Sequence, residues 1–149
     1  MTRRARNGPS CRGYFYARKM PMTEYSIYLE APKDRKGKPA WINSNERTHW
    51  AVRAEKTRAW RLVAKIAAQN AGLPKGLGRA HITCAIHKTT NRSYDAGNLS
   101  PTAKAIVDGL VSDYGLLPDD SNAYLTGPDM RHGDKKDTAG ITITIKETT

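Results

Sequence analysis

The sequence predicts a single small α/β domain in which two helices cover one mixed β-sheet. The chain of 149 residues has the length of one ordinary domain. Segments with the periodicity of strands also alternate with segments of helical periodicity, in the order strand, helix, strand, helix, strand, strand. We expect residues 23–149 to form this domain and residues 1–22 to form a basic, flexible leader.

Three segments alternate apolar and polar residues in the way that half-buried strands do. They are Tyr25 to Leu29, Arg79 to His87 and Gly140 to Lys146. A fourth and shorter strand is expected near Ala123 to Thr126, after the polar loop that follows the second helix. Together these segments predict one four-stranded sheet.

Two segments have helical periodicity. The first runs from Ala51 to Ala71, and Gly72 is expected to end it. The second is expected to begin with Ser100 as N-cap and Pro101 as the first helical residue, and to end at Gly115. Its buried face is predicted to consist of Ala103, Ile106, Val107, Leu110, Val111 and Tyr114.

The chain has a formal net charge of +11, and the charge is unevenly distributed. Residues 1–22 contain six Lys or Arg and no acid, and residues 31–92 contain fourteen against three acids. Residues 95–137 reverse the balance, with eight acids against four basic residues. A carboxylate-rich segment in a basic protein is the pattern of a metal-dependent nuclease, because a divalent cation must bridge carboxylates and bound phosphates. A solvated acidic loop is the alternative.

Other features exclude several classes of protein. The sequence lacks an apolar run of the roughly 18 residues that span a bilayer, and its start lacks the apolar stretch of a signal peptide, so we expect a cytoplasmic protein with no membrane partner. Cys11 and Cys84 are expected to be free thiols, and the histidine spacing is not that of a zinc site. Neither a small-molecule cofactor nor a catalytic histidine is expected.

Two acidic clusters flank the second predicted helix: Asp95 before it, and Asp119 with Asp120 after it. Mg²⁺ commonly takes one or two protein carboxylates and completes its shell with water and substrate phosphate, so these residues would suffice. Aspartates in turns more often cap helices. About 20 Å of helix would separate the clusters, so either the chain from Gly115 to Asp120 doubles back or a partner subunit completes the site.

The stretch from Asp95 to Asp120 resembles the signature of the RusA family of Holliday junction resolvases, especially those of phages. The similarity lies in Asp-x-x-Asn-Leu from Asp95 to Leu99, Lys-Ala-Ile-Val-Asp-Gly-Leu from Lys104 to Leu110, and Leu-Pro-Asp-Asp from Leu117 to Asp120. The order of elements from Tyr25 to Glu147 is also similar. The resemblance implies a RusA-like fold and an endodeoxyribonuclease that resolves four-way DNA junctions in recombination and repair, with Mg²⁺ as cofactor or Mn²⁺ in its place.

The resemblance also implies roles for individual residues. Asp95 and Asp120 correspond to catalytic, metal-binding aspartates, and Lys104 corresponds to a catalytic lysine early in the helix. Such a lysine neutralises the scissile phosphate or the leaving group. Asp119 is a further candidate metal ligand. We expect Asp108, one turn after Lys104, to hold the lysine through an i,i+4 pair.

The sequence departs from the family pattern at Gly97, where the family usually has a second aspartate just before the Asn-Leu pair. One expected metal ligand is therefore missing. Either Asn98, Asp119 or a water fills its place, or metal affinity and activity are reduced. The sequence leaves these alternatives open.

Basic residues are expected to hold DNA phosphates with little readout of base sequence. The leader is a candidate DNA-grasping arm. A homodimer is expected, because two symmetric cuts in a junction of approximate two-fold symmetry need two related active sites. The expected DNA-binding residues are Arg92 and Lys88 before the motif, and Lys33, Arg35, Lys36 and Lys38 in a charged loop.

Two other functions compete with a nuclease. One is a non-catalytic branched-DNA-binding protein that kept the fold, and the other is a basic RNA-binding protein in which the aspartates are only caps. Trp41 and Trp50 are candidates for stacking on unpaired bases, whereas Trp60 is more simply a core residue of the first helix.

Overall fold

The computed structural model describes residues 23–148, so the predicted leader lies outside the described residues. A single 3₁₀ turn, η2 (Ala96–Leu99), precedes the second helix, and a π-helical segment, η3 (Gly109–Tyr114), continues it. The prediction of a small mixed α/β domain is confirmed. The main elements are β1 (Glu24–Glu30), α1 (Trp50–Ala71), β2 (Ala80–His87), α2 (Ser100–Asp108), β3 (Leu125–His132) and β4 (Gly140–Glu147).

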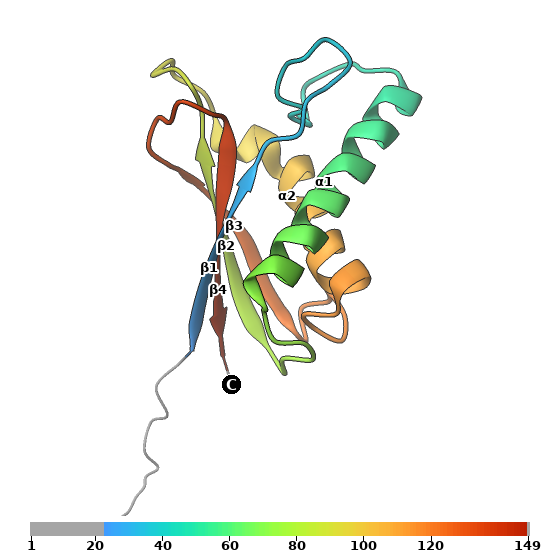
Figure 1. Ribbon diagram of the computed structural model, residues 1–149, viewed down its shortest axis with the longest axis vertical. Coiled ribbons are helices and arrows are strands. Elements are labelled where there is room, and N and C mark those ends of the chain that lie inside the picture. The colour runs from blue at the N-terminus through green and yellow to red at the C-terminus, as the bar shows by residue number, and fades with distance from the viewer. Residues whose placement is uncertain (1–22, 149) are drawn as a thin grey trace, which may run out of the picture.

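The four strands form one sheet in the order β1-β4-β2-β3 (Figure 1). β4 is antiparallel to both β1 and β2, whereas β2 and β3 are parallel. The carboxyl ends of β1, β2 and β3 therefore lie beside the start of β4, at what we call the upper end of the sheet. Three loops leave this end: residues 31–49, 88–99 and 133–139.

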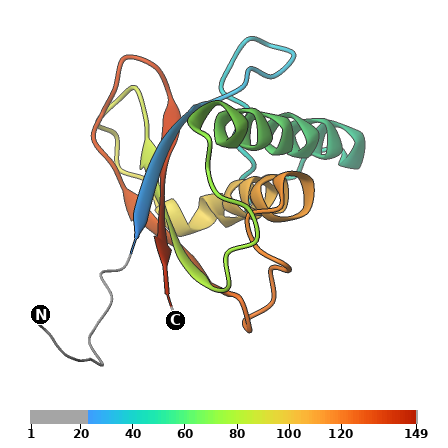
Figure 2. The ribbon, with the colours of Figure 1, turned by 60° about the horizontal axis from the view of Figure 1, so that its bottom comes forward.

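Both helices pack on the same face of the sheet (Figure 2). The isoleucines at 141, 143 and 145 of β4 are fully buried, as are the apolar residues at 82, 84 and 86 of β2. The residues between them point to the other face, which neither helix of residues 23–148 covers. Trp60 of α1 is fully buried and donates a hydrogen bond from Nε1 to the carbonyl of Ala40 at 2.7 Å. The predicted core role of Trp60 is confirmed.

The second helix packs closely against the first. All six residues of its predicted apolar face are buried. A Cβ atom at Gly109 would lie 2.5 Å from the carbonyl oxygen of Arg61, so the backbones meet where only glycine fits. Arg61 also donates two hydrogen bonds to the Asp113 carboxylate, at 2.9 and 2.8 Å. The predicted stops at Gly72 and Gly115 are confirmed, because both adopt the left-handed conformation that favours glycine.

The second helix begins one residue earlier than predicted, and a 3₁₀ turn precedes it. Ser100 is already the first residue of α2, and its side chain is not the N-cap. The helical path begins earlier because Asp95 caps η2, with Oδ1 accepting a hydrogen bond from the backbone N–H of Gly97 at 2.9 Å.

The fourth strand also differs from its prediction. β3 runs from Leu125 to His132 and not from Ala123 to Thr126. Only Leu125 of β3 is buried, because the strand lies at the edge of the sheet, and the alternation that marks a half-buried strand is therefore missing. An edge strand also tolerates Pro128, which lacks a backbone N–H. Within residues 23–148, neither helix is long and apolar enough to cross a membrane.

Candidate functional site

The upper end of the sheet holds all six basic residues that the sequence predicts to contact DNA. Four of them lie in the loop after β1, and Lys88 and Arg92 lie in the loop after β2. The structure adds Lys135 and Lys136, which lie between β3 and β4, and places Arg47 of the basic 31–92 region just before α1. Sequence reasoning missed Lys135 and Lys136, because the parallel pairing of β2 with β3 cannot be inferred from periodicity.

Asp34 organises the charged loop after β1. Its Oδ1 accepts hydrogen bonds from the backbone N–H groups of Lys36 and Lys38, at 2.8 and 2.9 Å. These bonds, that from Lys38 first, hold the pKa of Asp34 below its usual value. Lys33 and Pro39 pair across the loop. Asp34 thus stabilises the fold of this loop, and the lysine side chains of the loop remain exposed.

Lys88 lies between two aromatic rings at the end of β2. Its Nζ is 4.8 Å from the centre of the Tyr94 ring and 5.5 Å from that of Trp41. Burial lowers the pKa of Lys88, and no carboxylate of residues 23–148 forms an ion pair with it. A neighbouring cleft of about 360 Å³ is lined by Lys88, Arg92 and Lys135 among others. A cation held this way, with further cations around a cleft, is suited to bind an anion.

Asp95 lies in the same loop as Lys88 and Arg92. Its side chain is exposed and caps η2 through one oxygen, as described above. The backbone of Gly97 does not require glycine, but a Cβ there would lie 3.2 Å from Oδ1 of Asp95. A side chain at position 97 would therefore start beside the Asp95 carboxylate.

Lys104 is held between two carboxylates. Its Nζ donates to Asp108 Oδ1 at 2.9 Å, so the predicted i,i+4 pair is confirmed, and to Asp120 Oδ2 at 2.5 Å. The hydrogen bond to Asp120 contributes most to raising the pKa of Lys104, and the same contact lowers the pKa of Asp120. At neutral pH Lys104 is thus a fixed positive charge, and Asp120 is ionised and partly neutralised.

Asp95 and Asp120 lie in loops that leave opposite ends of the sheet. Asp95 follows the end of β2, whereas Asp120 precedes β3, whose first residue pairs with Ala80 at the start of β2. The chain does double back after Gly115, far enough for Asp120 to reach Lys104. Between residues 23 and 148 no three His, Cys, Asp or Glu side chains gather in an arrangement that could hold a metal ion.

The donor chemistry nevertheless suits Mg²⁺ at Asp95. Its carboxylate is exposed and has no cation among residues 23–148 as hydrogen-bond partner, and Mg²⁺ commonly uses a single carboxylate together with phosphate oxygens. At Asp120 the Lys104 ammonium occupies Oδ2, so a metal ion that binds this oxygen would have to displace the ammonium. Asp119 is exposed in the same loop.

Two histidines have structural partners. His87 is buried between the carbonyl oxygen of Asp134 and the hydroxyl of Thr142, at 2.8 and 2.7 Å. His81 lies 2.7 Å from Asp129 on the uncovered face of the sheet. The Cys84 thiol is fully buried, and burial raises its pKa to about 12, so it is unreactive at neutral pH.

Comparison of the chain with protein-family models and with curated proteins gave no match.

Proposed function

We propose that this protein is a Mg²⁺-dependent endonuclease that cuts branched DNA, such as a Holliday junction, in the manner of the RusA family. The observation that supports this best is the placement of Asp95, an exposed carboxylate, in the same loop as Lys88 and Arg92. The cations attract phosphate, and the carboxylate can bind a metal ion beside it.

In this proposal Asp95 holds the ion, and Lys88 and Arg92 hold the phosphates on either side of the cut. When bound, Mg²⁺ supplies an activated water and stabilises the leaving oxygen during phosphodiester hydrolysis. The aromatic rings around Lys88 keep its ammonium in place and limit its hydration. The contacts are to the DNA backbone, so recognition depends on the shape of the junction.

Lys104 and Asp120 have a separate part in the proposal. Because Lys104 stays protonated, it acts through charge and not as a proton donor or acceptor. Asp120 remains the proposed second carboxylate, and phosphate or metal binding must loosen its contact with Lys104. A homodimer is proposed for the reason of symmetry given above.

The test is incubation of a synthetic four-way junction with the full chain in Mg²⁺ or in EDTA. Paired cuts in opposite strands are expected in Mg²⁺ and none in EDTA. A linear duplex of the same arm sequence is the control and should stay intact. Binding without cutting in either Mg²⁺ or Mn²⁺ would reject the endonuclease.

A specific observation also favours the non-catalytic alternative, in which the protein binds branched DNA without cutting it. The Asp120 carboxylate is tied to an ammonium, and Gly97 supplies no second carboxylate beside Asp95. Under this alternative, junction affinity is the same in Mg²⁺ and in EDTA, and the junction is recovered uncut.

A further inference from the structure

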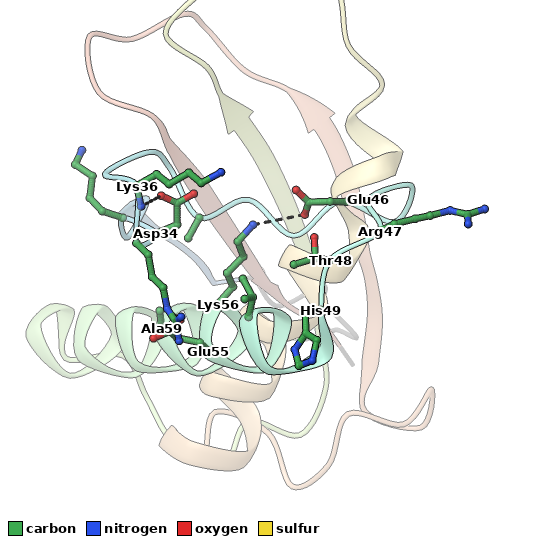
Figure 3. A pocket seen from close by; sticks show the side chains of 13 residues that line it. Asp34, Lys36, Glu46, Arg47, Thr48, His49, Glu55, Lys56 and Ala59 are labelled. Carbon is green, nitrogen blue, oxygen red and sulfur yellow. Dashed lines mark hydrogen bonds and ion pairs between the residues drawn. The ribbon is translucent and has the colours of Figure 1, made fainter.

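A second basic cavity lies at the upper end of the sheet, on the side of α1 (Figure 3). Its volume is about 760 Å³, and its walls are the charged loop after β1, the segment from Glu46 to His49, and the first half of α1. It contains none of the proposed catalytic residues. A cavity of this size accepts a ligand as large as a nucleotide but excludes a DNA duplex.

The acids that line this cavity already have partners. Glu55 accepts a hydrogen bond from Arg35 at 3.0 Å, and Glu46 contacts Lys56 Nζ at 3.5 Å. Asp34, as described above, accepts from backbone N–H groups of its own loop. Asp34 keeps its negative charge, but the lining contains five Lys or Arg against three acids, so an excess of positive charge remains.

Three cations of the lining have no ion-pair partner among residues 23–148: Lys33, Lys36 and Arg47. All three are exposed, and Figure 3 shows Arg47 extending outward at the rim. Lys56 stands inside the cavity, where its side chain is only 11% exposed. This distribution of charge favours an anionic ligand that runs from the interior of the cavity across its rim.

An exposed aromatic pair adjoins the cavity. Trp50, the first residue of α1, is 75% exposed, whereas Trp60 is fully buried. The ring of His49, which lines the cavity, lies 5.6 Å from the Trp50 ring at an interplanar angle of 30°. The first turn of α1 contains no acid, so its partial positive charge is not offset. A flat, exposed ring beside unpaired cations is the arrangement that binds unpaired nucleotides.

We propose that this cavity binds a short unpaired stretch of DNA strand, with a base stacked on Trp50 and His49 and the phosphates on Lys33, Lys36 and Arg47. This inference deepens the proposed function and rests on it, because branched DNA is the substrate that presents unpaired strand near a cut. The cavity shares no lining residue with the Lys88 cleft and does not include Asp95, so it would hold DNA without taking part in hydrolysis.

The test measures binding of a short fluorescent oligo(dT) to the full chain by anisotropy, without metal. Trp50→Ala is expected to weaken binding about fivefold or more, and Trp50→Phe to retain most of the affinity, because stacking needs only an aromatic face. Lys36→Gln and Arg47→Gln should each make the dependence of log affinity on log salt shallower by about 0.7. Arg58→Gln removes an exposed cation of α1 outside the cavity and should leave both quantities unchanged.

Equal affinity of wild type and Trp50→Ala, or an equal loss in Arg58→Gln, would overturn the inference. Much tighter binding of oligo(rU) than of oligo(dT) would also overturn it, because RNA would then be the occupant. These results do not depend on cleavage. Junction cutting by the same proteins in Mg²⁺ tests the proposed function separately, so failure of one is distinguishable from failure of the other.

Discussion

The two ends of the second helical segment differ sharply in how they are held. The segment before it, residues 88–99, is largely exposed and contains Asp95, Lys88 and Arg92. The segment after it is closed: Leu116 and Leu117 are buried, and the carbonyls of Gly115 and Leu116 accept backbone hydrogen bonds at 2.9 and 2.8 Å. The segment before the helix exposes side chains that a ligand can contact. The segment after it anchors the helix to the rest of the domain.

The aspartates at the two ends differ accordingly. Asp95 accepts a hydrogen bond from a neutral backbone N–H, so its negative charge remains available to a cation. The Asp120 carboxylate forms an ion pair with Lys104, which partly neutralises its charge. Two residues of one motif therefore differ in chemistry, which supports the proposal that Asp95 is the primary metal ligand.

The largest expected effect is that of Asp95→Asn. Cleavage of a four-way junction should fall about 100-fold or more, because loss of a metal ligand costs at least as much as loss of its supporting groups. Binding in EDTA should be unchanged or tighter, since a charge that repels phosphate is removed. Cleavage at the wild-type rate would remove Asp95 from the site.

Asp120→Asn tests whether the second aspartate is catalytic or only a partner of Lys104. If it is catalytic, cleavage should fall by roughly 10- to 100-fold while junction binding is kept. Asp108→Asn is the matched control, because it also removes a carboxylate from Lys104 but leaves Asp120 in place. Equal losses in the two variants would mean that Asp120 acts only through Lys104. Gel assays of the same junction measure both cleavage and binding.

Gly109→Ala should weaken the closed region. The added Cβ would lie 2.5 Å from the Arg61 carbonyl and 3.0 Å from the Ala64 Cβ, and neither can move without shifting α1. We expect a loss of about 1–3 kcal/mol in the free energy of unfolding, with a fall in Tm of roughly 2–4 °C per kcal/mol. Ser112→Ala, at an exposed position of the same segment, is the control and should change Tm little. A wild-type Tm for Gly109→Ala would contradict the close helix contact.

Gly97→Asp should have a smaller effect, at the open end. It restores the carboxylate of the family pattern beside Asp95, and the Mg²⁺ concentration for half-maximal cutting should fall by several-fold. Without metal the two carboxylates repel, so the variant should also be slightly less stable in EDTA than in Mg²⁺, by thermal unfolding. An unchanged or higher Mg²⁺ requirement would show that another group already fills the position.

Much of the fold could be predicted because burial leaves a periodic trace in the sequence. β2 and β4 alternate, and the second helix has an apolar face, because one side of each element packs against another layer of the domain. β3 was mispredicted because only Leu125 of the strand is buried. The start of α2 was mispredicted because Asp95 and Ser100 both suit an N-cap, and only the backbone path shows which one serves.

The candidate site could be predicted only where its contacts are local. The Lys104–Asp108 pair follows from helical spacing, since residues four apart share a face. The Lys104–Asp120 contact depends on the return path of the chain after Gly115, which no local rule specifies. The cavity beside α1 depends on a loop folded by Asp34 against a distant helix. In the sequence, this cavity is indicated only by the charged residues of the loop and by Trp50.

The contact at Gly109 has a consequence for the DNA. Gly109 leaves no room between the helices and Arg61 donates two hydrogen bonds to Asp113, so these contacts fix the second helix against α1. Under the proposed function, DNA that binds this domain has to adjust to a fixed helix, and the energy of bending and unstacking the DNA enters the binding free energy. We expect junctions with flexible pyrimidine–purine steps at the branch point to be bound and cut in preference to stiff ones, although no side chain reads those bases.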